Sequence, residues 1–249
     1  MLSLLRKVRK KLLEEGSFGS YLLYALGEIV LIILGILVAL WIDGKTEEGR
    51  EARQEQFYLE GLRDEFQLSL TKLDTLVAVN RKTYVTARDL LASIPVAESR
   101  EDEKALARGL IATLSFEIDY NPNNSLLREM MNAGRLQTLS DPALRRQLTS
   151  WESILESVNR QESNLRNIRE QLLEVALGPK GSILAIMQDA GIASRYVGQE
   201  LPRSAHSNLP MLKSQEFENK LVTFLVTAEG TESVHYLPLR HEILSILKR

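Results

Sequence analysis

Hydrophobic residues are concentrated in one nearly continuous run close to the start of the chain. Residues 21–42 read YLLYALGEIVLIILGILVALWI, and Glu28 is the only charged side chain among them. As a helix this run would extend roughly 33 Å, enough to cross the hydrocarbon of a bilayer. Tyr21 and Trp41 stand near its two ends, where amphipathic rings favour the membrane interface. The pattern predicts a transmembrane helix over 21–43 and, because no other stretch is as apolar, a single crossing.

The residues on either side of this run predict its orientation. The arm over 1–20 is basic and amphipathic, whereas the flank after the run mixes both signs of charge. The positive-inside rule then places the N-terminus in the cytoplasm and residues 44–249 outside it. The run is too long for a signal-peptide core, so an uncleaved anchor is expected. The basic side chains could contact lipid headgroups or act only in topology: Arg6, Lys7, Arg9, Lys10 and Lys11.

One side of the predicted membrane helix carries features of a helix–helix contact. At 100° per residue, Tyr21, Glu28, Gly35, Ala39 and Ile42 share that side. Gly35 and Ala39 form a small-xxx-small pair, which lets two helix backbones approach closely. Ionisable residues in membrane spans usually face protein or water. We favour a homo-oligomer with Glu28 in a polar seam or near a pore, over a lone helix with a protonated Glu28.

After the membrane run, the spacing of apolar residues is helical throughout. They recur at three- and four-residue steps, and no stretch alternates long enough to predict a strand. The expected fold is therefore all-α, with the membrane helix continuing into an extracytoplasmic helical bundle over 44–249. The expected helices cover about 45–93, 101–116, 125–134, 141–177, 183–190 and 214–248.

Several local features refine these expected helices. The first has nearly heptad spacing, which suits a coiled coil or a bundle seam. Asn80 within its stripe could set the register or lie at the bundle edge. Ser125 is the expected cap of one helix, and Ser140 or Asp141 that of the next. Glycine and proline near the C-terminus, at Gly230 and 238, predict a kink or break in the last helix.

Composition and charge exclude several kinds of chemistry. The chain has 249 residues, 31 Lys and Arg against 33 Asp and Glu, three His and no Cys. A net charge of −2 argues against a nucleic-acid partner, and the absence of Cys removes thiolate metal sites and cysteine nucleophiles. No phosphate-binding, zinc-protease or serine-hydrolase motif is present. We expect no catalytic residue, no metal, no cofactor and no enzymatic activity.

A few individual residues invite a functional reading, and each also has a simpler structural one. The acidic stretches 64–65 and 101–103 are expected to be solvated, the second favoured by its helix dipole. Trp151 is expected in the core rather than stacked on a ligand. His206, His235 and His241 lack the spacing of a metal site on one helix face.

Two segments carry a resemblance to a known family. Residues Arg6–Asp43, RKVRKKLLEEGSFGSYLLYALGEIVLIILGILVALWID, resemble the opening of the DUF6090 family of uncharacterised bacterial membrane proteins, which is abundant in Bacteroidetes. Residues 126–148, LLREMMNAGRLQTLSDPALRRQL, resemble a helix pair of the same family more loosely. The resemblance implies a single-pass protein with a helical extracytoplasmic domain, and it implies no reaction, ligand or catalytic residue.

Three functional hypotheses follow for such a protein of the bacterial inner membrane. The favoured one is a self-associating anchor that presents a periplasmic helical domain for structural or protein-interaction roles, with lipid, a second copy and another protein as partners. The alternative is an oligomeric ion channel with Glu28 near the pore. The third is a sensor-like ligand-binding domain, which would act through a partner because only about 20 residues are expected in the cytoplasm.

Overall fold

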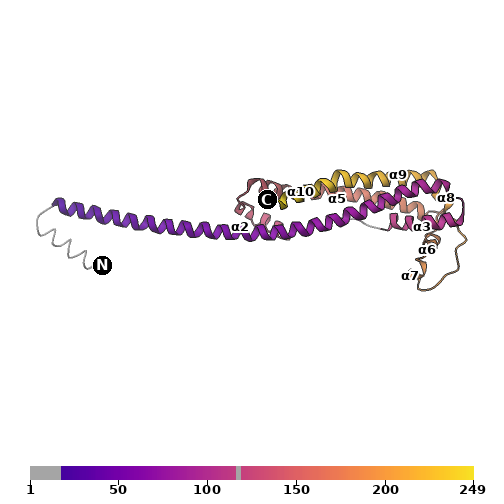
Figure 1. Cartoon of the computed structure of the whole chain (residues 1–249), viewed down its shortest axis with the longest axis horizontal. Coiled ribbons are helices and arrows are strands. Elements are labelled where there is room, and N and C mark those ends of the chain that lie inside the picture. Colours follow the sequence, from indigo (N-terminus) through magenta and orange to yellow (C-terminus); the bar gives the residue numbers. More distant parts are fainter. Residues whose placement is uncertain (1–17, 116–118) are drawn as a thin grey trace. The chain divides into compact units, whose positions relative to one another are not determined.

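The computed structural model describes residues 18–115 and 119–249, and every regular element in those ranges is helical (Figure 1). The fold is all-α, as the sequence predicts. The elements are α2 (Phe18–Ser93), the 3-10 turn η1 (Ile94–Val96), α3 (Arg100–Leu114), α4 (Ser125–Asn132), the 3-10 turn η2 (Arg135–Thr138), α5 (Pro142–Leu177), α6 (Ile183–Asp189), α7 (Ala193–Val197), α8 (Leu209–Leu212), α9 (Gln215–Gly230), the π-helix η3 (Thr231–Tyr236) and α10 (Leu237–Leu247).

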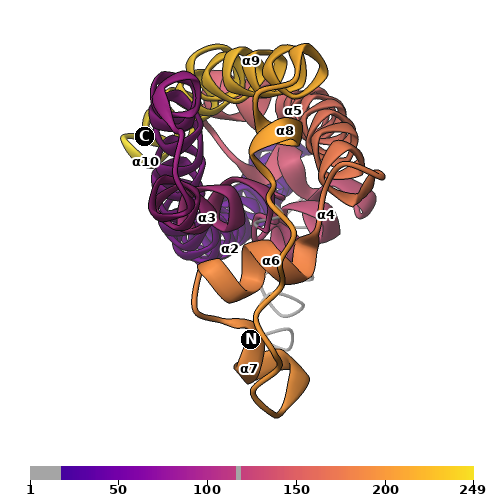
Figure 2. The ribbon, with the colours of Figure 1, turned by 90° about the vertical axis from the view of Figure 1, so that its right-hand side faces the viewer.

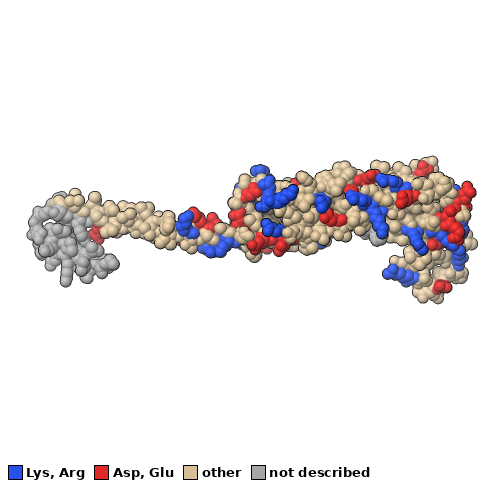
Figure 3. All heavy atoms as spheres, in the orientation of Figure 1, with Lys and Arg blue, Asp and Glu red and all other residues tan. Residues whose placement is uncertain are grey.

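The chain divides into two units, Met1–Phe57 and Tyr58–Arg249, and the boundary falls inside α2. The described part of the first unit is the N-terminal part of this helix. It contains a window of mean hydropathy 2.7, none of which is buried. Figure 3 shows the apolar stretch as mostly tan atoms, with red atoms near its start, and blue and red side chains become frequent beyond it. By length and composition this helix can cross a membrane.

The core of the second unit consists of two clusters of buried side chains. One lies among α2, α3, α5, α6 and α9 and includes Leu110, Leu172 and Phe224. The other lies among α2, α4, α5 and α10, where Phe66 meets Trp151 edge to face with ring centroids 4.9 Å apart. Figure 2 looks along the bundle and shows α2, α5 and α9 around this interior. Burial of this apolar surface is the main force that holds the helices together.

The face of α2 that enters this core repeats in steps of four, four and three residues. The buried positions at its start are Tyr58, Leu62, Phe66, Ser69, Leu73, Val77 and Asn80. These steps make an 11-residue repeat, which differs from the seven-residue repeat of a left-handed coiled coil. Its period of about 3.67 residues is slightly longer than that of a straight α-helix and favours a slight right-handed supercoil, if any.

The helix starts follow their expected signals at one position and not at another. Asp141 caps α5 by accepting a hydrogen bond from the Ala143 amide at 2.7 Å, and proline follows in the first turn. The prediction of a Ser125 cap is wrong, because α4 already begins at that residue. The carboxylate of Glu65, on α2, accepts from the Leu126 amide at 2.7 Å. A side chain expected to be solvated thus caps α4 from another helix.

The C-terminal third of the chain differs most from expectation. The helical region expected over 214–248, with a kink or break at Gly230 or 238, is α9, η3 and α10, and the change of helix type begins directly after Gly230. The stretch over 191–213, for which no helix was expected, contains α7 and α8. These helices are only 5 and 4 residues long. Such short elements gain most of their stability from packing rather than from their own sequence.

Candidate functional site

The π-helix η3 is surrounded by buried polar side chains. Its hydrogen bonds span five residues, as in the bond from the Leu237 amide to the Glu232 carbonyl. π-Helical segments are rare in proteins, and many of those that are known lie at functional sites. At its start, the Ala228 carbonyl accepts a hydrogen bond from Nδ2 of Asn80 at 2.9 Å. Asn80 is fully buried, so it lies inside the bundle and holds α2 against this junction.

Further polar contacts join η3 to two neighbouring helices. Arg81, from α2, donates from Nε to Oε1 of Glu232 at 3.0 Å and forms an ion pair with the same carboxylate. Gln161, from α5, donates to Oγ1 of Thr231 at 3.0 Å. These side chains join α2, α5 and η3. Sliding one of these segments past another would break the hydrogen bonds of Asn80 and Thr231 and leave buried polar groups unpaired, which is costly.

Glu162 is the central titratable group of this region. It lies on α5 and is only 3% exposed. Its Oε1 accepts hydrogen bonds from the Tyr236 hydroxyl at 2.8 Å and from the Tyr120 amide at 2.9 Å. Burial raises the pKa of Glu162 to about 7, against the opposing effect of these two hydrogen bonds. Burial also raises the pKa of Tyr236, which remains a neutral donor.

A cleft of about 700 Å³ lies beside Glu162, between α5 and the segment that leads into α4. Carboxylates on its wall outnumber guanidinium groups. The charged lining residues are Asp119, Glu152, Glu156, Glu162, Arg128 and Arg166. Arg166 pairs with Asp119, and Arg128 lies 3.7 Å from Glu152. A polar cleft next to a buried carboxyl of raised pKa is the strongest candidate binding site in the described ranges.

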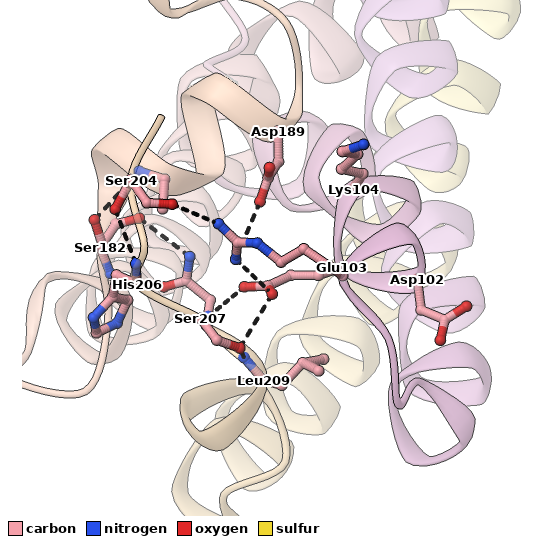
Figure 4. A network of polar contacts seen from close by, with 12 residues as sticks. Asp102, Glu103, Lys104, Ser182, Asp189, Ser204, His206, Ser207 and Leu209 are labelled. Carbon is pink, nitrogen blue, oxygen red and sulfur yellow. Dashed lines mark hydrogen bonds and ion pairs between the residues drawn. The ribbon is translucent and has the colours of Figure 1, made fainter. Parts of the chain in front are cut away.

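A second polar network fastens the segment before α8 onto α3 (Figure 4). Glu103 was expected to be solvated but is only 2% exposed. Its carboxylate accepts hydrogen bonds from Arg100 Nη1 at 2.7 Å, from the Ser207 hydroxyl at 3.1 Å and from the Asn208 amide. Arg100 also donates to the Ser204 carbonyl at 3.0 Å. Because these polar groups are hydrogen-bonded to one another, we interpret the network as structural: it holds the segment before α8 against α3.

The residues of the predicted membrane seam belong to the first unit, and in a single chain the described ones are exposed. Glu28, Gly35, Ala39 and Ile42 are all exposed. A Cβ atom added at Gly35 would meet nothing within 4 Å. The side chain of Tyr21 lies outside the described part of the chain, as do Arg6, Lys7, Arg9, Lys10 and Lys11. Self-association and lipid contact therefore stay predictions.

The remaining candidates have structural surroundings. Trp151 is fully buried in the core, as predicted. Nε2 of His206 lies 3.1 Å from the Lys180 carbonyl. Over residues 18–115 and 119–249 no group of three His, Asp or Glu side chains is arranged to hold a metal ion.

Sequence reasoning missed Glu162, Gln161 and Tyr236. A signal for Glu162 exists: the apolar stripe of α5 includes Val158 and Leu165, and position 162 falls on the same face. A charged residue at a core position of an amphipathic helix is unfavourable unless it is hydrogen-bonded. The same logic had singled out Asn80 on α2. Tyr236, the partner of Glu162 in the π-helix, has no comparable sequence signature.

The fold and the site define an all-α protein with one helix able to cross a membrane and a helical domain that encloses a polar cleft. The chain belongs to the DUF6090 family, described as a family of unknown function, whose model matches residues 28–175. The match covers α3, α4 and nearly all of α5, including Glu162. Neither the curated proteins nor the solved structures contain a match to this chain.

Proposed function

We propose that this protein is a single-pass anchor of the bacterial inner membrane that self-associates through its membrane helix and presents a helical domain outside the cytoplasm for structural or protein-interaction roles. The observation that supports this proposal is the apolar window of α2, none of which is buried. Leu31 and Trp41, for example, are 71% and 67% exposed. In water such a surface is strongly unfavourable, whereas lipid accommodates it.

Topology is tested by fusing a reporter to the C-terminus. A phosphatase that is active only outside the cytosol should be active in this fusion, and the chain should sediment with membranes and need detergent for extraction. The expectation follows from the basic N-terminal arm and the positive-inside rule. A fusion active only as a cytosolic reporter, or a chain that stays soluble without detergent, would contradict the proposal.

Self-association predicts a selective effect of Gly35→Leu. Apart from the adjacent backbone of its own helix, a Cβ at this position meets nothing within 4 Å, so the monomer should tolerate the larger side chain. A neighbouring helix packed on Gly35 would be pushed away. We expect the oligomer in mild detergent to weaken by at least about tenfold, or about 1.4 kcal/mol. Light scattering coupled to size exclusion measures this change.

Gly44→Leu is the matched control, because Gly44 also has open space around it and lies on the opposite side of the helix. It should leave the mass of the particle unchanged. An equal mass for wild type and Gly35→Leu would overturn the seam. Ion flux through liposomes that carry the wild type, lost in Glu28→Gln, would instead favour the channel alternative.

The cleft beside Glu162 supports a second candidate function, a sensor-like domain that binds a small ligand. A cleft of about 700 Å³ has the size of a small-molecule site. Glu162 links it to α5 and, through Tyr236, to η3. A ligand that changes the protonation of this carboxyl would alter the packing of α5 against η3.

A further inference from the structure

Glu162 differs from the other buried glutamates in having no paired cation. Glu103 forms an ion pair with Arg100, and Glu232 forms one with Arg81. No such ion pair joins Glu162 to Lys, Arg or His within the described ranges. A buried carboxylate without a counter-ion is strongly unfavourable in its charged form. Arg166, on the same helix, has the smallest effect of the neighbouring groups on the pKa of Glu162 and is paired with Asp119, so a ligand could supply a closer positive charge.

The geometry shows where such a charge could enter. Both hydrogen bonds to Glu162 end on Oε1, and Oε2 has no hydrogen-bond partner among the residues that the structure describes. Glu162 lines the cleft, in which four carboxylates face two guanidinium groups. Both guanidinium groups already have acidic neighbours, Asp119 for Arg166 and Glu152 for Arg128. Glu156 is in turn paired with Arg160, so the unbalanced negative charge of the cleft is that of ionised Glu162.

We propose that this cleft binds an organic cation carrying an ammonium group, with Glu162 as its counter-ion. The inference rests on the second candidate function, that the helical domain binds a ligand. An ammonium group has three donors and no acceptor, which suits Oε2 of Glu162 and the carboxamide oxygens of Asn121 and Asn159 on the cleft wall. Leu155 and Val158 on the same wall offer an apolar surface to its carbon chain.

Binding of an ammonium group is coupled to loss of a proton from Glu162. The carboxyl is faced by Tyr236 from η3, by Tyr120 and Asp119 from the segment before α4, and by Arg166 from its own helix. Its pKa of about 7 means that below neutral pH the site is mostly protonated and neutral. An ammonium ligand binds the ionised form better, so its affinity should fall about tenfold between about pH 8 and pH 6.

Isothermal titration of the full chain in detergent micelles tests this inference, with putrescine as the probe and butanediol as the neutral probe of similar length. We expect putrescine to bind about tenfold more weakly at about pH 6 than at about pH 8. At about pH 6, its binding should also release a proton from Glu162 to the solvent. Glu162→Gln keeps an acceptor oxygen for Tyr236 and Tyr120 but removes the charge. It should lose at least about tenfold in affinity and the pH dependence.

Glu156→Gln is the matched control. Glu156 lines the same cleft but is 72% exposed and paired with Arg160 at 3.1 Å, so the change should alter affinity less than about twofold. Equal binding of putrescine by wild type and Glu162→Gln would overturn the inference, as would no binding up to about 10 mM. Binding of butanediol or Ca²⁺ without putrescine would refute the ammonium assignment while ligand binding by the domain still stood.

Discussion

Replacing Glu162 by glutamine should make the folded chain more stable than wild type at about pH 8, by about 3 kcal/mol. Glu162 has a pKa of about 7 when folded, against an ordinary value of 4.5, because its charged form is buried. The folded state therefore holds the proton more tightly than the unfolded state. Stability from this group is present at low pH and is lost as the pH rises from about 4.5 to about 7.

Urea unfolding followed by circular dichroism measures the difference between the two proteins. It should be below about 1 kcal/mol near pH 5 and should grow to about 3 kcal/mol near pH 8. Asp102 accepts a hydrogen bond from the Ser99 amide at the start of α3 at 2.8 Å, and Asp141 caps α5. Backbone amide hydrogen bonds lower the pKa of both carboxyls, so they titrate below this window. Glu156→Gln should show no such growth. A variant that is less stable than wild type at both pH values would refute the assignment of the buried charge.

Trp151→Ala should destabilise the second unit by about 3–5 kcal/mol, the range for removing a large aromatic side chain from a core. Trp151 is fully buried and lies edge-on to Phe66. Alanine would leave a cavity between α2 and α5, because closely packed neighbours relax only in part. The shift of the urea midpoint at constant slope measures this loss.

The chain supplies its own control for this change, because its 2 tryptophans lie in opposite environments. Trp41 is 67% exposed in the first unit, and Trp41→Ala should leave the unfolding of the bundle within about 0.5 kcal/mol of wild type. A Trp151→Ala midpoint within the same limit would show that this cluster is not the core of the domain.

The sequence predicted the helices that have a long amphipathic stripe or a strong boundary signal. The all-α class, the end of α2 at Ser93 and the start of α5 after Asp141 belong to this group. Hydrophobic period and capping residues act over a few positions, so they can be read along the chain. The short helices α7 and α8 carry neither signal, which is why no helix was expected there.

The candidate site was largely hidden from sequence reasoning. Asn80 stood out as a polar residue in an apolar stripe, and Glu162 offered the same signal on α5. What brings them into one region is η3, whose Tyr236 hydroxyl reaches Glu162 from a segment 74 residues away. Glu65 and Glu103 were expected at the surface because each stands among other charged residues. Their partners, the Leu126 and Asn208 amides, come from distant segments.

The sequence by itself determined that this chain is helical and has one segment apolar enough to cross a membrane, since both properties depend on residue type and local spacing. Tertiary structure alone decided which acidic side chains are buried and where the helix before α10 widens into a π turn. The physical reason is desolvation: the cost of burying Glu162, and hence its pKa, depends on which groups from other helices surround it. No local pattern records those neighbours.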